Sequence, residues 1–313
     1  MTSKVNIFVL ESPLQAIHCM EARSRLNNSN AKSIVIHKVS HNKKHSVQAE
    51  KVLRMGAWTK TYAFTQNKWY AQLLIVYYIL VIKLSGFEVE NIFIGDMRSK
   101  WMLLVAGSIK CEKVFMVDDG AGTPIRQEAD IAPAIQKAKM GDAAYDSGIV
   151  EGILLSLLFL SYLPITQLNL FTIHSIDALP GQVVIRHRYE ALKSLITEAH
   201  IVIRGSCIIG SNLVNAGIIS RCEYRDMIRY CAQELAAKDK EVVYYAHRWE
   251  SDDEISNYKS YNLTVITPDV PLEVYFLMRK QIPSKIMSLP SFAVMSLGII
   301  YEGMGVEIEV ISV

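Results

Sequence analysis

The sequence has few cysteines, and they are scattered along the chain. Its 313 residues include five, and no two of them form a C-x-x-C pair. A disulfide framework and a structural zinc site both need closely spaced cysteines, so neither is expected and a reducing compartment is favoured. The five are Cys19, Cys111, Cys207, Cys222 and Cys231.

Neither positively nor negatively charged residues are in clear excess. Lysine and arginine together number 33 and aspartate and glutamate 31, which gives a formal net charge of +2. That balance offers no electrostatic footprint for nucleic acid, and we expect no nucleic-acid partner. The patterns G-x-G-x-x-G and G-x-x-x-x-G-K-[ST] do not occur. The sequence therefore predicts neither a dinucleotide site nor a phosphate-binding P-loop.

Long hydrophobic runs are also missing. The apolar segment 5–10 is too short for a signal peptide, and no small-residue cleavage site follows it. Residues 70–82 are apolar apart from Gln72, and residues 153–163 apart from Ser156 and Ser161, but a membrane span takes about 20 residues. Each stretch is typical of a buried helix or of an apolar helix that rests on a membrane surface. We expect a cytoplasmic protein, with peripheral contact at the cytoplasmic face of the inner membrane left open.

The sequence does contain an alternation of strand and helix patterns. Continuous apolar runs, typical of strands buried on both faces of a sheet, alternate with helical patterns in the first half. Ser12 provides an N-cap and Pro13 stands at the first helical position, so a helix should follow the first strand directly. We predict a doubly wound domain over 1–175. Its strands are 5–10, 33–37, 91–94 and 113–117, and its helices include 70–82 and 97–106.

The second half repeats this alternation. Pro180 and Gly181 give a turn signal near the start of a second domain, which we place at 176–313. The predicted fold class is α/β, with two Rossmann-like domains facing a central cleft. The predicted strands are 199–203, 207–209, 241–246, 263–267, 285–289 and 306–313. The predicted helices are 223–237, 271–279 (capped by Asp269) and 292–297.

An acid pair follows one predicted strand, at the edge where open parallel sheets bind ligands. The pair is Asp118 and Asp119, and Gly120 comes next in a glycine-rich turn. One carboxylate can brace that turn. The other, desolvated beside a like charge, would gain the proton affinity of a general base. A solvated turn and a metal-binding acid pair are the alternatives.

His247 and Arg248 follow another predicted strand. A guanidinium and a protonated imidazole suit a phosphate group. The alternative interpretation pairs Arg248 with Glu250 or Asp252 on the surface and leaves His247 as a polar loop residue.

Two predicted helices begin with polar side chains near the same edges. Glu273 lies in a first turn, where an acid stabilises the helix dipole and could also accept the hydroxyls of a ribose. Ser291 opens the next helix, either as a simple N-cap or as part of a phosphate seat. Gly210 and Ser211 follow a further strand.

Histidines also recur at a spacing of four, at His37, His41 and His45. That spacing is typical of a ladder of metal ligands. The segment also contains Lys43 and Lys44 and has the composition of a polar loop, which indicates solvated surface instead.

These residues, in this order, resemble the bacterial sialyltransferases of capsule and lipooligosaccharide synthesis, including the polysialyltransferases. Arg248 departs from the family's pattern, which usually has proline after the histidine, and Phe292 follows Ser291 where the family has tandem serines. The matching residues are spread along most of the chain. They are Ser12-Pro13-Leu14-Gln15, Ile94-Gly95-Asp96 with Trp101, Asp118-Asp119-Gly120, Ile209-Gly210-Ser211-Asn212-Leu213, His247, Glu273 and Ser291.

The resemblance implies a GT-B fold, a CMP-activated nonulosonic acid as donor, inversion at the anomeric carbon, and no metal or other cofactor. Sialic, pseudaminic and legionaminic acids are the candidate sugars. Carried over by position, the roles are Asp118 as base on the acceptor hydroxyl, His247 as general acid or phosphate stabiliser, Ser291 as phosphate ligand and Glu273 as cytidine ligand. The supporting residues are Ser12, Asp119, Gly120 and Arg248, with Gly210 and Ser211 in the nucleotide and phosphate site.

The expected function is therefore an inverting glycosyltransferase that moves a nine-carbon sugar acid to a sugar hydroxyl of a surface glycan. A lipid-linked acceptor is left open. A GT-B-shaped sugar-nucleotide epimerase or hydrolase would use the same acids and histidine but needs no second sugar. A non-catalytic capsule-assembly protein, with its apolar helices as an interface, is the third interpretation.

Overall fold

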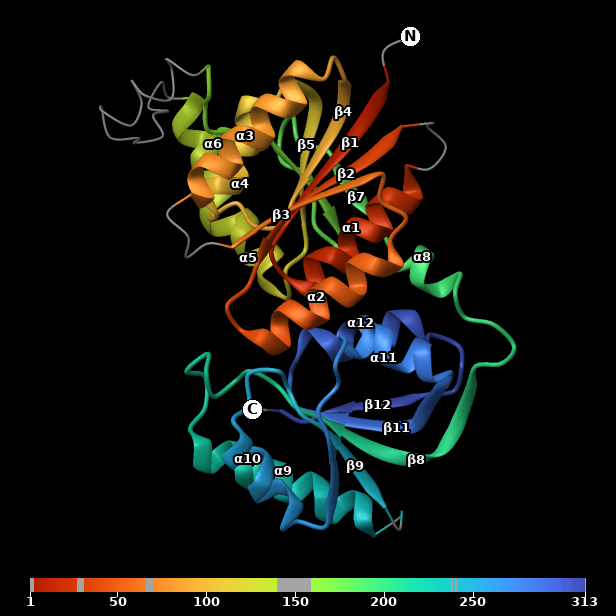
Figure 1. Ribbon diagram of the computed structural model, residues 1–313. Helices are drawn as coiled ribbons and strands as arrows, with labels where there is room; N and C mark the ends of the chain where they lie inside the picture. The colour runs from red at the N-terminus through yellow and green to blue at the C-terminus, as the bar shows by residue number, and fades with distance from the viewer. Residues whose placement is uncertain are drawn as a thin grey trace. The chain divides into compact units, whose positions relative to one another are not determined.

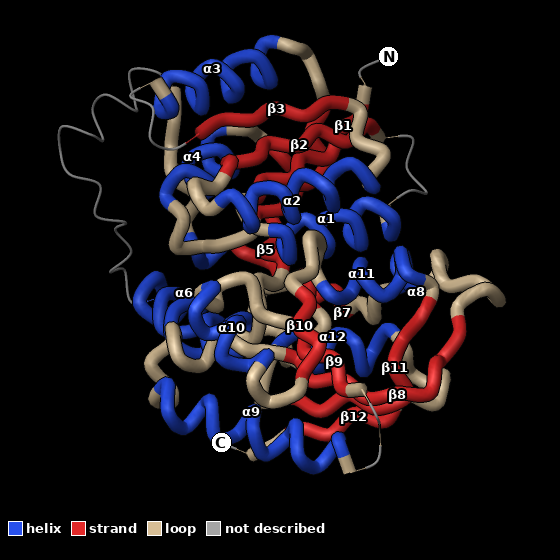
Figure 2. The backbone as a smooth tube through the Cα atoms, turned by 60° about the horizontal axis from the view of Figure 1, so that its bottom comes forward, coloured by secondary structure: helices blue, strands red, loops and turns tan. Residues whose placement is uncertain are grey.

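The computed structural model describes residues 3–26, 31–65, 70–139, 159–237, 239 and 241–312. The chain divides into two units, Met1–His187 and Arg188–Val313. Each unit is an open sheet of parallel strands with helices on both faces (Figures 1 and 2). The predicted α/β class with two parallel sheets is confirmed.

The first unit has a seven-stranded sheet in the order β3-β2-β1-β4-β5-β6-β7. Helices α1 and α2 cover one face, and α3, α4 and α6 cover the other (Figure 1). The strands are β1 (Lys4–Leu10), β2 (Lys32–Val39), β3 (Lys60–Thr65), β4 (Glu88–Ile94), β5 (Cys111–Val117), β6 (Leu168–Thr172) and β7 (Val184–Arg186). The helices are α1 (Pro13–Arg25), α2 (Lys43–Met55), α3 (Ala71–Leu84), α4 (Lys100–Ser108), α5 (Gly122–Arg126) and α6 (Ala132–Lys139). A π-helical turn, Gln127–Ile131, joins the last two helices.

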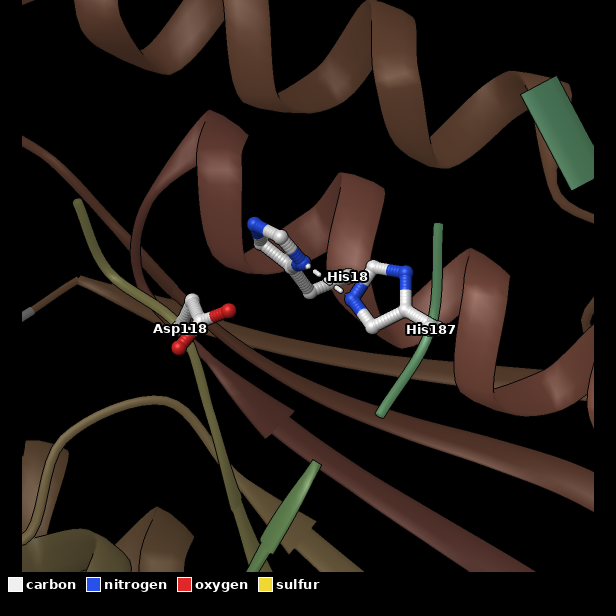
Figure 3. Close-up of side chains that lie close together, drawn as sticks. All are labelled: His18, Asp118 and His187. Carbon is white, nitrogen blue, oxygen red and sulfur yellow. Dashed lines mark hydrogen bonds between the residues drawn. The ribbon is translucent and has the colours of Figure 1, made fainter. Parts of the chain in front are cut away.

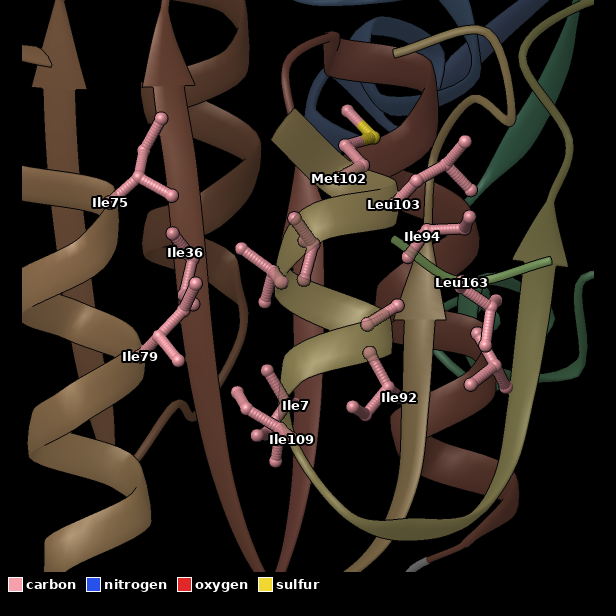
Figure 4. Packing of buried hydrophobic residues seen from close by; sticks show 14 of the residues in the cluster. Ile7, Ile36, Ile75, Ile79, Ile92, Ile94, Met102, Leu103, Ile109 and Leu163 are labelled. Atoms are coloured by element: carbon pink, nitrogen blue, oxygen red, sulfur yellow. The ribbon is translucent and has the colours of Figure 1, made fainter. Parts of the chain in front are cut away.

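Alternating side chains place two apolar layers against this sheet. On one face, Ile7 of β1 and Ile36 of β2 pack with α3 and α4, as Figure 4 shows. On the other face the ring of Phe8 stacks on Phe93 at 5.1 Å, and Phe93 stacks on Phe115 at 5.2 Å. Because both faces are buried, these strands are apolar at successive positions, which is the pattern that made them predictable from sequence.

The first unit extends past the expected domain boundary. β6 pairs with β5, and β7 pairs with β6, so both strands belong to the first sheet. The predicted boundary at 175/176 falls between these two strands, and the unit continues to His187.

The second unit has a five-stranded sheet in the order β10-β9-β8-β11-β12. Helices α9 and α10 cover one face, and α11 and α12 the other (Figure 1). The strands are β8 (Ile201–Ile209), β9 (Val242–Tyr245), β10 (Leu263–Ile266), β11 (Gln281–Ser288) and β12 (Glu307–Val310). The helices are α8 (Glu190–Lys193), α9 (Arg221–Ala236), α10 (Asp252–Lys259), α11 (Leu272–Arg279) and α12 (Phe292–Ile300).

Two local predictions in the second unit are wrong. The two short strands predicted at 199–203 and 207–209 are one strand, β8, in which Gly205 has φ +153° opposite the shift in register along β11. Glycine tolerates that conformation, so the irregularity does not end the strand. Asp269 is not the N-cap of α11, because that position is held by Pro271.

The two apolar stretches of the sequence, 70–82 and 153–163, are described to different extents. In α3, Ile75 and Ile79 are buried, whereas Tyr77 is 57% exposed and Leu84 is 84% exposed. One stripe of this helix therefore packs on the sheet while another is exposed, and contact of the exposed stripe with a membrane stays a prediction. Residues 153–158 of the second stretch lie outside the described residues. Among the helices that the structure describes, none has the length and apolarity needed to cross a membrane.

Candidate active site

The strand order of each sheet reverses at one place, and ligands of open α/β sheets bind beside such a reversal. In the first sheet it lies between β1 and β4, which are followed by Ser12 and Gly95. In the second sheet it lies between β8 and β11, which lead into Gly210 and Ser291. Predicted site residues therefore flank both reversal points.

At the first reversal, Ser12 and Gln15 hold the carboxylate of Asp119. The Ser12 hydroxyl donates to Asp119 Oδ1 at 2.8 Å, and the Gln15 amide donates to Oδ2 at 2.9 Å. Ser12 also caps α1 by accepting the Gln15 backbone N–H at 3.1 Å. Both donors are buried, while Asp119 itself is exposed. The hydrogen bonds from Ser12 and Gln15 thus fix the orientation of an exposed carboxylate at the edge of the sheet.

Two glycines allow this arrangement for different reasons. A Cβ on Gly95 would lie 2.0 Å from Gln15 Oε1, so only glycine leaves room for the amide that holds Asp119. Gly120 has φ +90°, a backbone conformation that side chains rarely adopt. Gly120 therefore allows the backbone to turn after the two acids, and Gly95 leaves the space that the Gln15 amide occupies.

Asp118 is the buried member of the pair, with no exposed surface. Its Oδ1 accepts the Thr172 hydroxyl at 2.7 Å, and its Oδ2 accepts the Ile173 N–H at 2.8 Å. Burial raises the pKa of Asp118, while the hydroxyl of Thr123 and these other donors oppose that rise. Asp118 is therefore the buried carboxyl group, which joins the end of β5 to the end of β6 and to Thr123, and Asp119 is the one that faces solvent.

Two buried histidines lie next to Asp118 (Figure 3). His18 of α1 and His187, which follows β7, share a hydrogen bond of 2.9 Å between Nδ1 and Nε2. Burial, with His187 and then His174 nearby, lowers the pKa of His18 well below its usual value, so its ring is neutral.

Within the first unit, the ligand atoms of His18, Asp118 and His187 lie within 4.8 Å of one another and could in principle hold a cation. One ring nitrogen of each histidine already bonds to the other histidine. Both Asp118 oxygens likewise accept bonds from protein donors. Each of the three residues thus already has a protein hydrogen-bond partner, and the absence of a metal cofactor stays a prediction.

In the second unit a buried acid organises the loop after β9. Glu250 accepts bonds from the hydroxyls of Tyr244 at 2.8 Å and Tyr224 at 3.2 Å, and from the His247 N–H at 3.2 Å. Burial raises the pKa of Glu250 to about 7. A Cβ on Gly210 would lie 2.4 Å from Glu250 Oε1. Gly210 therefore gives this carboxyl group its space, and Glu250 is a buried acceptor rather than the surface partner weighed for Arg248.

His247 is half-buried on that loop, and its tautomer follows from its neighbours. The Trp249 N–H donates to Nδ1 at 3.4 Å, which assigns the proton of the neutral ring to Nε2. Burial, with the charge of Arg248, lowers the pKa of His247 to about 4. At neutral pH this residue therefore offers a neutral N–H donor rather than the imidazolium expected from sequence.

Glu273 and Ser291 lie at the starts of the neighbouring helices α11 and α12. Glu273 is 3% exposed and accepts the hydroxyl of Ser296. Burial raises its pKa, which Ser296 and the charge of Arg248 oppose. Ser291 caps α12 by accepting the Val294 N–H at 3.4 Å. Ser211, also predicted here, is buried, and its N–H donates to Tyr224 at 2.8 Å.

The histidine ladder is not on a loop. Asn42 caps α2, which carries Lys43, Lys44 and His45, and His45 is buried. His37 lies in β2 and is also buried, so the prediction of a solvated segment is wrong for these two histidines. The prediction overlooked α2 because its apolar residues lie mainly in its second half.

Comparison of the sequence with protein-family models and with curated proteins finds no match. Among solved structures, the chain is similar to the crystal structure of a sialyltransferase from Photobacterium damsela. The TM-score is 0.43 and the identity 10%, over 95% of this chain and 72% of that one. A likeness of that extent assigns no activity to this chain, whose function has to be argued from its own residues.

Proposed function

We propose that this protein is an inverting glycosyltransferase that uses a CMP-activated nonulosonic acid. In the reaction, an acceptor hydroxyl oxygen bonds to the anomeric carbon, the bond from that carbon to the CMP phosphate breaks, and a base takes the hydroxyl proton. The observation that carries the proposal is the division of chemistry between the reversal points. The exposed carboxylate of Asp119 lies at the first. The second has the Nε2–H of His247 and the start of α12, while the carboxyl groups of Glu250 and Glu273 there are buried. A GT-B arrangement, with both edges facing one cleft, is part of this proposal.

We assign the base to the acid pair, with Asp118 in that role as the resemblance implies. Burial raises the pKa of its carboxyl group, which is the direction that a base needs. Because the side chain has no exposed surface, this role requires the bonds from Thr172 or Ile173 to open when the acceptor binds. Asp119 is the second candidate, because its carboxylate is the exposed one and is aimed by Ser12 and Gln15.

The leaving phosphate would be met in the second unit. His247 Nε2–H, the guanidinium of Arg248 and the backbone N–H groups in the first turn of α12 beside Ser291 are the donors we assign to it. A well-placed donor of this kind contributes roughly 3 kcal/mol to transition-state stabilisation. Glu273 would bind the cytidine, and Gly210 and Ser211 would line the nucleotide site.

We also propose a cytoplasmic protein that contacts the inner membrane through the exposed stripe of α3. Leu73, Tyr77 and Leu84 lie on that stripe, at 61%, 57% and 84% exposure, and Lys83 stands beside them. Flotation with anionic vesicles should carry the protein, and Leu84→Glu should lower the bound fraction. Flotation that is unchanged by the substitution would remove α3 from the proposal.

The test of the function is incubation with CMP-activated sialic, pseudaminic and legionaminic acids, with and without acceptor glycans. Transfer that requires an acceptor supports the proposal. Turnover without an acceptor would indicate the hydrolase or epimerase alternative, and neither reaction would favour the assembly protein.

A screen of nucleotides by thermal shift gives an independent readout. A ligand at 100 times its Kd stabilises the folded protein by about 2.7 kcal/mol, and CMP or CDP should lead. His247→Ala should lose both turnover and part of the CMP affinity. A preference for UDP or GDP would overturn the sialyltransferase assignment.

A further inference from the structure

The loops that follow β8 and β9 start side by side in the second unit, because these two strands are paired neighbours. We call residues 210–215 the β8 loop and residues 246–250 the β9 loop, which contains His247. The backbone N–H of Gly210 donates to the Tyr245 carbonyl at 2.9 Å, so both loops leave the sheet from one fixed point. Beyond that point, their relative position depends on side chains.

Glu250 joins the two loops through one tyrosine. Its Oε1 accepts the His247 N–H at 3.2 Å and the Tyr224 hydroxyl at 3.2 Å. The Tyr224 oxygen in turn accepts the Ser211 N–H at 2.8 Å. Glu250 is 7% exposed and Tyr224 is 2% exposed, so water competes little for these bonds. A continuous chain of hydrogen bonds therefore runs from the backbone of the β8 loop to the backbone of the β9 loop.

The same residue closes the β9 loop on itself. The backbone N–H of Glu250 donates to the His247 carbonyl at 3.0 Å, while its carboxyl group accepts the His247 N–H. Tyr244 adds a hydroxyl at 2.8 Å and 2.9 Å from the two carboxyl oxygens. These bonds from Glu250 to His247 go to the backbone of the histidine rather than to its ring, so they fix the residue that carries the ring.

A second contact between the loops supports the first. The side-chain amide of Asn215, in the β8 loop, donates to the Trp249 carbonyl in the β9 loop at 3.3 Å. The titratable and charged groups around the Glu250 carboxyl group and the His247 ring are Tyr224 and Arg225 of α9, Tyr244 of β9, Arg248 of the β9 loop, and Glu254 and Tyr258 of α10.

We propose that Glu250 is a positioning residue of the nucleotide site, which holds the β8 and β9 loops together through Tyr224 and thereby sets the place of the His247 ring. A hydrogen-bond donor that is held in place beforehand costs no reorganisation when charge develops on the leaving phosphate. The purpose of this arrangement rests on the proposed function, because only that proposal assigns His247 to the CMP phosphate. The link between the loops is measurable without any substrate.

The experiment is NMR of the histidine rings in the full chain, in which His247→Ala identifies the His247 signal. The readout is the charge of this ring at about pH 5.5. Burial, with the charge of Arg248, lowers the pKa of His247 to about 4, so the wild-type ring should be neutral. In Glu250→Ala the loop should open, and the ring should titrate near the unperturbed value of about 6.5 and be mostly protonated. Glu250 has a pKa of about 7 and is itself protonated at this pH, so its substitution removes hydrogen bonds but no charge.

The variants separate positioning from a general loss of stability. Glu250→Gln keeps an oxygen for the His247 and Tyr224 donors, and should leave both the neutral ring and the CMP affinity near those of the wild type. Glu250→Ala should weaken CMP binding about tenfold. Tyr224→Phe breaks the link to the β8 loop, so it should raise the protonated fraction of His247 and weaken CMP binding several-fold.

Tyr258→Phe is the matched control. The Tyr258 ring lies 4.7 Å from that of Tyr244 in the same aromatic cluster, but among the described residues its hydroxyl takes no part in the chain of bonds to Glu250. It should change neither the His247 ring nor the CMP affinity.

If Glu250→Ala does not fold, Tyr224→Phe against Tyr258→Phe carries the test. A His247 ring that stays neutral in the folded variants of Glu250 and Tyr224, or that changes equally in Tyr258→Phe, would overturn the proposal. If the wild type does not bind CMP, the proposed function fails, while the charge of the His247 ring still decides whether Glu250 positions it.

Discussion

The carboxyl edges of the two sheets are built alike but present opposite chemistry. In each unit a buried acid accepts hydrogen bonds that shape the loop: Asp118 from Thr172 and Ile173, and Glu250 from two tyrosines and a backbone N–H. Beside the first acid, Asp119 presents an acceptor. Beside the second, His247 presents a donor. At each edge a buried carboxyl group thus holds neighbouring segments together, and a residue close to it presents either a hydrogen-bond acceptor or a donor.

The largest effect should come from removing the acid of the first edge. Asp118→Asn keeps an oxygen for Thr172 but loses the base, so transfer should fall by about 10²- to 10⁴-fold while CMP binding stays near that of the wild type. Steady-state kinetics and calorimetry measure the two. Asp119→Asn is the matched variant. If it is the inactive one and Asp118→Asn transfers normally, the base belongs to the exposed acid.

The buried acid of the second edge should affect stability through pH. Burial moves the pKa of Glu250 from 4.5 to about 7, so the folded state holds this proton more tightly than the unfolded state. Its contribution to stability is full below pH 4.5 and is lost as the pH rises through 7, about 3 kcal/mol in all. Urea unfolding at pH 5 and pH 8 should show this loss in the wild type and much less of it in Glu250→Gln. Equal losses in both proteins would argue against a raised pKa.

The glycine beneath Asp119 offers a smaller perturbation of the first edge. Gly95→Ala places a Cβ against the Gln15 amide and should cost about 1–3 kcal/mol of unfolding free energy. It should also lower transfer, because Asp119 loses one of its two donors. Gly122→Ala is the control, since a Cβ there meets nothing within 4 Å. Similar behaviour of the two variants in urea unfolding would show that Gln15 moves aside freely.

Ser291 has two roles to distinguish at the second edge: it is the N-cap of α12, and we assign it to the phosphate site. Ser291→Ala and Ser251→Ala each remove an N-cap, of α12 and α10, and should each cost about 1 kcal/mol. Only Ser291→Ala should also weaken CMP binding, by about tenfold or 1.4 kcal/mol. Thermal unfolding and calorimetry give both quantities. Unchanged CMP affinity would leave Ser291 with the cap alone.

The smallest effect on transfer should come from removing metal ions with a chelator. His18 and His187 bond each other, and Asp118 is held by protein donors, so no step in our proposal needs a metal ion. A CMP donor also carries a single phosphate, which gives Mg²⁺ no diphosphate to bridge. Transfer in excess EDTA with metal-free reagents should match the untreated rate. Loss of activity that Mg²⁺ or Mn²⁺ restores would reassign Asp118 and Asp119 as metal ligands.

Features set by neighbouring residues were predictable from the sequence. The start of α1 needs only a serine, a proline and a backbone N–H three residues after the serine, and the structure has all of them. The stripe of α9, with Tyr224, Ile228 and Leu235 buried, also follows from its periodicity. By contrast, β3, β6 and β7 were missed, because polar residues interrupt the apolar runs of β3 and β6, and β7 has only three residues.

The sequence by itself determined the class of each sheet, the start of α1 and the presence of acids and a histidine after the strands, because these depend on local patterns. Only the tertiary structure decided which acid is buried, that Glu250 lies under the His247 loop, and that His18 meets His187 from 169 positions away. Burial and hydrogen bonding between distant segments set the pKa of a group, and one chain position alone specifies neither.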